Sequence, residues 1–82
     1  MNHELKTWPE YYDKVVSGEK TFELRKNDRY FKVGDTLTLQ KYCPNEEKYL
    51  GWEITVEVTY ILEGGNFGLE EGFVIMGFKY LK

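Results

Sequence analysis

The feature that most constrains the fold is a long alternation of apolar and polar residues over positions 52–62. The apolar positions of this alternation are Trp52, Ile54, Val56, Val58, Tyr60 and Leu62. A period of two places them on one face of a β-strand and leaves the intervening glutamates and threonines on the other. We therefore expect a long strand with one face in the core and one face in solvent.

Two further stretches also favour strands. Residues 36–43 alternate, with Leu37 and Leu39 as the inward pair. Residues 73–81 are apolar on both faces, which is typical of a strand in the interior of a sheet or under a helix. Polar or glycine-rich loops at residues 44–48 and 64–68 separate these strands.

Residues 8–17 have helical spacing instead. Their apolar positions are Trp8, Tyr11, Tyr12, Val15 and Val16, which form one stripe. Thr7 and Glu10 fit a capping box at the start, Pro9 suits the first turn, and Gly18 can end the helix in a left-handed conformation. Such a short helix is stable only when its stripe packs on a sheet, so we expect the aromatic residues to lie in the core.

The segments on either side of this helix read as two more strands. Residues 3–7 form a brief strand, and residues 20–26 alternate clearly. In the second segment we expect Phe22 and Leu24 to face the core and the polar residues between them to form an exposed row. Asn27 and Asp28 then favour a turn, because their side chains hydrogen-bond to the nearby backbone.

The predicted order of elements is β-α-β-β-β-β with short connections. We therefore assign the chain to the α+β class, mainly β, as a small barrel of about five or six strands with one short helix, in a single domain over residues 1–82. A layered ferredoxin-like sheet is the second choice, because it needs another helix that the pattern does not supply.

Composition limits the kinds of site and the cellular compartment that we expect for this protein. The chain of 82 residues has one cysteine, Cys43, and one histidine, His3, so neither an internal disulfide nor a metal site is expected, and no cofactor motif is present. No apolar run approaches the length of a membrane helix. We expect a cytoplasmic protein without membrane contact, either a monomer or a weak dimer.

Charge is unevenly distributed along the chain. Five basic and two acidic side chains lie within residues 20–32, although the net charge of the chain is −3. A basic segment on an acidic protein favours an anionic ligand. The candidate ligand-binding residues in and around it are His3, Lys6, Lys20, Thr21, Glu23, Arg25, Lys26, Asn27, Asp28 and Arg29.

These residues also have purely structural interpretations. Glu23 and Arg25 can form an ion pair on one strand face, and Asn27 can simply stabilise a turn. Tyr30 is the aromatic residue that we expect to be free to stack on a base. His3 is expected to be a hydrogen-bonded structural residue that lies close to the site.

The order of several short motifs resembles a known family. The helix end at residues 17–21, the segment at residues 20–29 and Val33-Gly34-Asp35 resemble the ASCH domains of the PUA-like superfamily. The resemblance is closest to a small ASCH-like family of unknown function from bacteria and phages, and it extends over nearly the whole chain. It implies a PUA-like β-barrel that binds RNA or a nucleotide in a cleft beside the helix.

Some small ASCH proteins are amidohydrolases that deacetylate N4-acetylcytidine with a Lys, a Thr and a Glu. The resemblance places that Lys at Lys20, but Glu23 occupies the position of the Thr, and the segment that carries the Glu has no counterpart here. We therefore expect an RNA- or nucleotide-binding module rather than an enzyme. In the alternative, a nucleoside amidohydrolase, Lys20 and Glu23 would be catalytic. A third reading is a phage interaction protein that contacts a host factor through an acidic face formed by Glu46, Glu47, Glu53 and Glu57.

Overall fold

The computed structural model describes residues 1–81 and contains one helix and five strands in a single sheet. The elements are β1 (Asn2–Thr7), α1 (Pro9–Ser17), β2 (Phe22–Lys26), β3 (Thr36–Cys43), β4 (Lys48–Glu63) and β5 (Phe73–Tyr80). Their order in the sheet is β1-β3-β4-β5-β2. β1 runs parallel to β3, and every other neighbouring pair is antiparallel.

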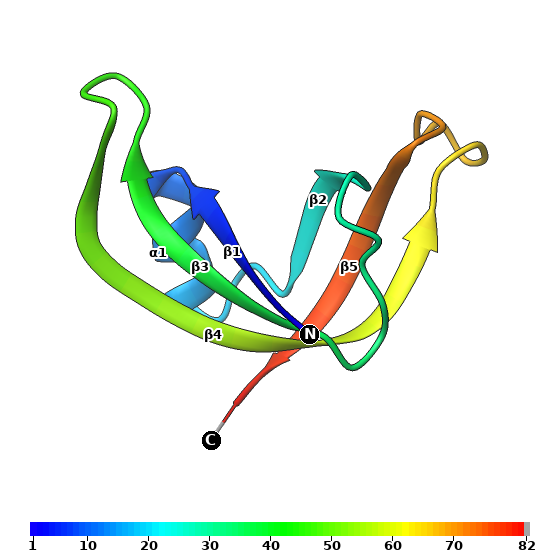
Figure 1. Cartoon of the computed structure of the whole chain (residues 1–82), viewed down its shortest axis with the longest axis horizontal. Helices are drawn as coiled ribbons and strands as arrows, with labels where there is room; N and C mark the ends of the chain where they lie inside the picture. Colours follow the sequence, from blue (N-terminus) through cyan, green and yellow to red (C-terminus); the bar gives the residue numbers. More distant parts are fainter. Residues whose placement is uncertain (82) are drawn as a thin grey trace.

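The sheet is curled into a half-barrel with two arms (Figure 1). β4 passes through the base and belongs to both arms, so it pairs with β3 along its first half and with β5 along its second. Two register shifts, opposite Gln40–Tyr42 and at Val58–Tyr60, interrupt these ladders. Such irregularities bend and twist a strand, which is how β4 can serve both arms. The predicted small, mainly β barrel with one short helix is confirmed.

The hydrophobic core lies inside the curled sheet. Its buried members are Leu5, Val15, Phe31, Leu37, Leu39, Val56, Val58, Val74, Met76 and Phe78. Every strand except β2 contributes to this set, and α1 contributes Val15. β5 has β4 on one side and β2 on the other, which confirms the prediction of an interior strand.

The predicted apolar face of β4 is wrong beyond Val58. Val56 and Val58 are fully buried, but Tyr60 is exposed, and Ile61 packs against the core instead. The register shift between Val58 and Tyr60 inserts an extra residue, which reverses the facing of the residues that follow it. The start of the alternation fails as well, because Trp52 lies at the register shift opposite Gln40–Tyr42 and is exposed.

The capping box predicted at Thr7 and Glu10 is also wrong. The helix begins at Pro9, so the N-cap is Trp8, which forms no side-chain cap. Thr7 is still part of β1, and its hydroxyl donates a hydrogen bond to the Leu5 carbonyl oxygen. Pro9 at the first helical position explains this start, because its fixed φ suits a first turn and it has no N–H to cap. At the other end, Gly18 ends the helix at φ 86°, as predicted.

The expected orientation of β2 is reversed. Phe22 and Leu24 are 45% and 52% exposed, whereas Glu23, between them, is only 4% exposed. The polar row of this strand therefore faces the inside of the curl. Alternation defines the two faces of a strand but does not determine which one is inside, and here an ion-pair cluster takes the inner position. Within residues 1–81, no helix has the length and apolar character needed to cross a membrane.

Candidate functional site: an aromatic pocket beside a buried carboxylate

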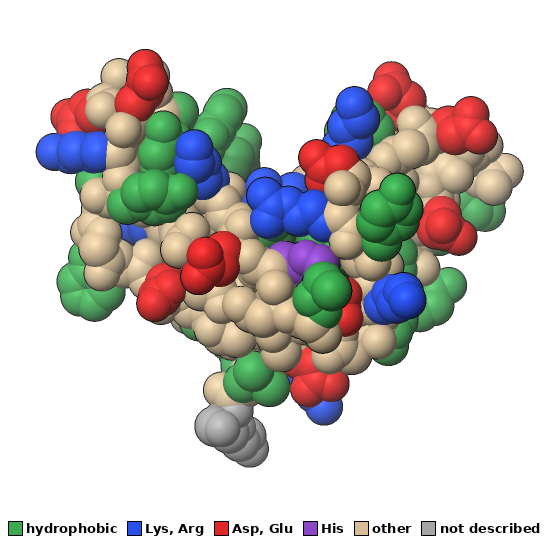
Figure 2. Space-filling model, in the orientation of Figure 1, with side chains coloured by type: hydrophobic (Ala, Val, Ile, Leu, Met, Phe, Trp, Pro, Cys, Tyr) green, Lys and Arg blue, Asp and Glu red, His purple; other side chains and the backbone are tan. Residues whose placement is uncertain are grey.

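A pocket of about 480 Å³ lies where the end of β1, the start of α1 and β2 meet. It is lined by residues 6–8, Tyr11, Lys20 and residues 22–25. The sheet leaves this space open because β1 and β2 are its two edge strands and have no shared ladder. Figure 2 shows Lys and Arg side chains gathered in the hollow between the two arms. Lys20 and Arg25 of the basic segment line the pocket.

Two stacked aromatic rings form one side of the pocket. The rings of Trp8 and Tyr11 lie 6.0 Å apart between centroids, with an angle of 22° between their planes. They are 49% and 48% exposed, so the prediction that they pack in the core is wrong. Only Tyr12 and Val15 of this helix are buried, which shows that the apolar stripe is wider than the face that the sheet covers. The remaining aromatic surface is available to a ligand.

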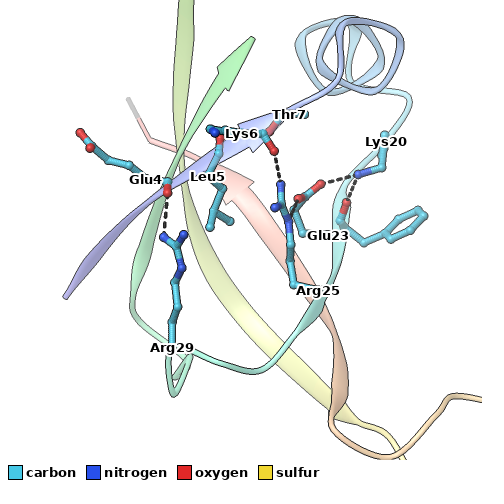
Figure 3. A network of polar contacts seen from close by, with 9 residues as sticks. Glu4, Leu5, Lys6, Thr7, Lys20, Glu23, Arg25 and Arg29 are labelled. Atoms are coloured by element: carbon cyan, nitrogen blue, oxygen red, sulfur yellow. Dashed lines mark hydrogen bonds and ion pairs between the residues drawn. The ribbon is translucent and has the colours of Figure 1, made fainter. Parts of the chain in front are cut away.

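Glu23 is held between two cations on the inner side of β2 (Figure 3). Its Oε1 accepts a hydrogen bond of 2.6 Å from the Lys20 ammonium, and its Oε2 accepts one of 2.8 Å from Arg25 Nε. Lys20 also donates to the Phe22 carbonyl oxygen at 2.7 Å. A buried carboxylate is stable only when its charge is paired in this way. The structural interpretation of Glu23 and Arg25 as an ion pair is confirmed.

Two arginines, Arg25 of β2 and Arg29 of the segment that follows it, contact the edge strand β1 where backbone pairing is missing (Figure 3). Arg25 Nη2 donates to the Lys6 carbonyl oxygen at 2.7 Å, and Arg29 Nη1 donates to the Glu4 carbonyl oxygen at 2.7 Å. Both acceptors lie on β1, whose outer edge would otherwise present unpaired carbonyls. We call these two contacts the arginine seam. It links β1 to β2 and to the segment after β2 through side chains.

The cations of the site also contact its rings. The Lys20 ammonium lies 5.0 Å from the centroid of Phe22 and 6.0 Å from that of Tyr11. A guanidinium has five N–H donors, and Arg25 uses Nε and Nη2 in the bonds described above. Its other donors can therefore serve a ligand. The pocket thus combines flat aromatic surface with cationic hydrogen-bond donors.

A smaller hollow of about 160 Å³ lies on the other side of Arg25. It contains Lys26, Asp28 and Arg29 from the predicted set, so the structure divides those residues between two concavities. Asn27 is in neither lining, because its side-chain oxygen accepts a hydrogen bond from the Phe31 N–H at 3.0 Å. This contact is the structural role that the turn interpretation of Asn27 predicts. Tyr30, the expected stacking residue, is highly exposed and lines neither hollow.

His3 and Thr21 lie outside both hollows as well. Thr21 is exposed, and its backbone carbonyl accepts a hydrogen bond from Phe78 N–H at 3.1 Å. His3 is buried, with its Nε2 2.9 Å from Asp35 Oδ2 and its ring against Phe31. Its hydrogen-bonded position agrees with the structural role expected of it. The sequence reading did not identify Asp35 as the hydrogen-bond partner of His3.

Asp35 gives the fold an acid-sensitive contact. Burial alone would raise the pKa of its carboxyl, but hydrogen bonds from His3, from the Lys32 N–H and from the Met1 amino group outweigh burial and lower the pKa. A carboxyl whose pKa is lower in the folded state stabilises the fold above its unfolded pKa of about 4. That stability is lost as the pH falls through the folded pKa.

We therefore expect the urea midpoint of the protein to fall as the pH is lowered from 5 to 2. Asp35→Asn should be less stable than the wild type at pH 6 and should show a smaller fall in the acid range, since it has no carboxyl at this position to protonate. Urea unfolding of both proteins across this range measures the difference. Parallel pH curves would show that Asp35 does not contribute to the acid sensitivity.

The pocket includes residues that sequence reasoning did not assign to it. Thr7, Trp8, Tyr11, Phe22 and Leu24 line it together with the predicted Lys6, Lys20, Glu23 and Arg25. One sequence feature could have identified the aromatic residues of the pocket: Trp8 and Tyr11 are one helical turn apart in a helix that is next to the basic segment. Within residues 1–81, no three His, Cys, Asp or Glu side chains come together as metal ligands would.

The fold and the site define a small, mainly β protein with an aromatic pocket beside a buried, doubly paired carboxylate. The chain belongs to the DUF3850 family, a domain of unknown function whose match covers residues 2–78. It is also 33% identical over 61 residues to an uncharacterized 12.9 kDa protein in the GpA 3′ region of Escherichia phage P2. This match covers 74% of the present chain and 54% of the phage protein, so the chain spans about half the length of that relative.

Proposed function

We propose that the protein is an RNA- or nucleotide-binding module of the ASCH, PUA-like type, whose ligand site is the pocket between β1, α1 and β2. The observation that carries this proposal is the exposed stack of Trp8 and Tyr11 directly beside the Lys20–Glu23–Arg25 cluster. The curled sheet and the position of the helix after β1 support the ASCH assignment. A cytoplasmic location is part of the same proposal.

The aromatic side of the pocket suits a nucleobase. Unpaired bases stack on aromatic side chains, and each such contact contributes on the order of 1–3 kcal/mol to binding. Trp8 keeps about half of its surface free although its backbone is fixed at the N-cap of α1. A ring that is held in place but still open can stack on a ligand with little loss of side-chain entropy.

The polar side of the pocket suits the rest of a nucleotide. Arg and Lys bind phosphate or carbonyl oxygens, Arg through two parallel N–H groups. Glu23 orients both cations, because each of its oxygens accepts one bond from them. Each oxygen retains a further lone pair for a base amino group. The pocket therefore offers donors to an anion and an acceptor to a base edge.

Calorimetric titration with the four ribonucleoside 5′-monophosphates tests this proposal. We expect at least one of them to bind more tightly than inorganic phosphate, because the base adds a stacking contact. Trp8→Ala should weaken that binding on the order of 10- to 100-fold, the loss of one stacked base. Because the other half of this side chain is buried, urea unfolding of the variant is needed to separate a loss of binding from a loss of folding.

Trp52→Ala is the matched control for this titration. Trp52 is an exposed tryptophan on β4 that does not line the pocket, so its removal should leave nucleotide binding unchanged. Absence of binding for all four nucleotides would overturn the proposal. Equal affinity losses in the two tryptophan variants would do the same, because they would show that binding does not depend on the pocket.

One contact favours a second function, an amidohydrolase acting on a modified nucleoside. The Lys20 ammonium and the Glu23 carboxylate lie 2.6 Å apart in the pocket lining. Lys20 could donate to the oxygen of an acetyl carbonyl while Glu23 accepts a proton from the attacking water, which is general acid–base chemistry. Incubation with N4-acetylcytidine would then release cytidine and acetate, and Lys20→Ala would abolish turnover. No release by the intact protein would exclude this function.

A further inference from the structure

A second aromatic cluster lies on β3 and β4, next to the turn of their hairpin. Tyr42 and Tyr49 are register partners across the two strands, and their ring centroids are 5.1 Å apart in an edge-to-face arrangement. Lys6 lies over them, with its ammonium 4.6 Å from the Tyr42 centroid and 5.9 Å from that of Tyr49. Tyr49 is 54% exposed, so a large part of this surface is free. We call these three residues the tyrosine subsite.

Lys6 connects the tyrosine subsite to the pocket. Its ammonium covers the two tyrosines, whereas its backbone carbonyl accepts the hydrogen bond from Arg25 that forms part of the arginine seam. Lys6 is also one of the residues that line the pocket. A single residue of β1 thus borders both aromatic surfaces.

We infer that the ligand of this protein is a short single strand of nucleic acid, with one base in the pocket and an adjacent base on the tyrosine subsite. This inference rests on the proposed function and assigns a second base position to it. Successive bases of a single strand stack on separate aromatic side chains, and basic side chains between them contact the connecting phosphates. Lys6, which borders both aromatic surfaces, is the basic side chain that would contact this phosphate. A free mononucleotide would use only the pocket.

The surrounding charges limit how many nucleotides can bind along the pocket and the tyrosine subsite. Glu46 and Glu47 occupy the turn beyond Tyr49, and Glu46 is paired with Lys48 at 3.2 Å. An acidic turn repels the phosphate backbone, so the strand cannot continue past the tip of the hairpin. The chain as a whole carries a net charge of −3, which disfavours a longer nonspecific path over the surface. We therefore expect a footprint of a few nucleotides.

Binding measurements with single-stranded RNA of one to eight nucleotides test this inference. Affinity for the wild type should rise on the order of 10- to 100-fold between one nucleotide and about three, and should then level off. Tyr49→Ala should remove most of this gain, while affinity for the mononucleotide should stay at the wild-type value. Lys6→Ala should reduce the salt dependence of oligonucleotide binding by about one phosphate contact.

Tyr60→Ala provides the matched control, since Tyr60 is another exposed tyrosine of β4 that belongs to neither aromatic surface. Tyr60→Ala should change neither the affinity for the mononucleotide nor the affinity for the oligonucleotide. Urea unfolding of Tyr49→Ala and Tyr60→Ala would separate effects on binding from effects on folding. A mononucleotide that binds as tightly as an octanucleotide would overturn the second base position and leave the pocket proposal intact. If neither ligand binds, the proposed function fails, and this inference fails with it.

Discussion

Replacement of Glu23 by alanine is expected to lower the free energy of unfolding by about 3 kcal/mol. Removing one member of a buried ion pair costs about 3–5 kcal/mol, because the other member is left without its partner. In this site two cations would be left side by side. The lower end of the range applies because the Lys20 and Arg25 side chains are 18% and 27% exposed and retain contact with water.

Urea unfolding at pH 7 measures this loss, and two variants serve as controls. Glu23→Gln retains the size of the side chain and one oxygen acceptor, so its loss should be smaller. Glu19→Ala removes the carboxylate of another Lys–Glu pair, Lys14–Glu19, in which both side chains are well exposed. That variant should unfold as the wild type does. If Glu23→Ala were as stable as Glu19→Ala, the cluster would not stabilise the fold.

Replacement of Gly64 by alanine is expected to destabilise the protein by about 3 kcal/mol or more. A Cβ at this position would lie 1.9 Å from the Glu70 carbonyl oxygen and 2.9 Å from that of Phe73. Both neighbours are backbone atoms, so the turn between β4 and β5 must move to admit the methyl group. Gly64 N–H also donates to the Phe73 oxygen at 2.8 Å, and that bond would be distorted.

Thermal unfolding measures this effect, and we expect the midpoint to fall by roughly 12 °C or more. Gly77→Ala is the matched control, because Gly77 lies in β5 and a Cβ there would be 3.7 Å from Thr59 Oγ1, an ordinary contact. That variant should be neutral or slightly more stable, since alanine loses less backbone entropy on folding. A midpoint for Gly64→Ala within two or three degrees of the wild type would contradict the clash.

Periodicity was sufficient to predict the elements of this fold. The alternation of β3 and the apolar character of β5 on both faces correspond to a strand with one buried pair and a strand in the interior of the sheet. Gly18 ends the helix because a left-handed residue there needs no side chain. These features depend on local sequence, and they could be predicted for that reason.

Which face of a strand lies inside the curled sheet could not be predicted in the same way. In β2 the polar residue Glu23 lies inside and its apolar neighbours Phe22 and Leu24 are exposed, because Lys20 and Arg25 converge on the carboxylate from within the curl. In β4 one extra residue after Val58 reverses the pattern. Neither outcome can be read from the alternation itself, because a period of two separates the two faces of a strand without indicating which face is inside and does not reveal a bulge.

The candidate site was predicted only in its charged half. Lys20, Glu23 and Arg25 come together as their clustering in the sequence indicates, and Lys6 joins them from β1. The aromatic half was missed, because helical spacing in Trp8 and Tyr11 is equally typical of core packing. Whether Trp8 and Tyr11 pack in the core or line a pocket depends on how much of the helix the sheet covers, and this is a property of the tertiary structure.

The pairing of the edge strands has a consequence for biosynthesis. β2 has β5 as its strand partner, with Phe22 opposite Gly77, whereas β1 pairs with β3 much earlier in the chain. A polypeptide that emerges from the ribosome at about 5–20 residues per second can assemble β1, α1, β3 and β4 while β2 still has no ladder. The β2 side of the pocket is fixed only when β5 arrives. The lining of the pocket is therefore complete only after β5 has been synthesised.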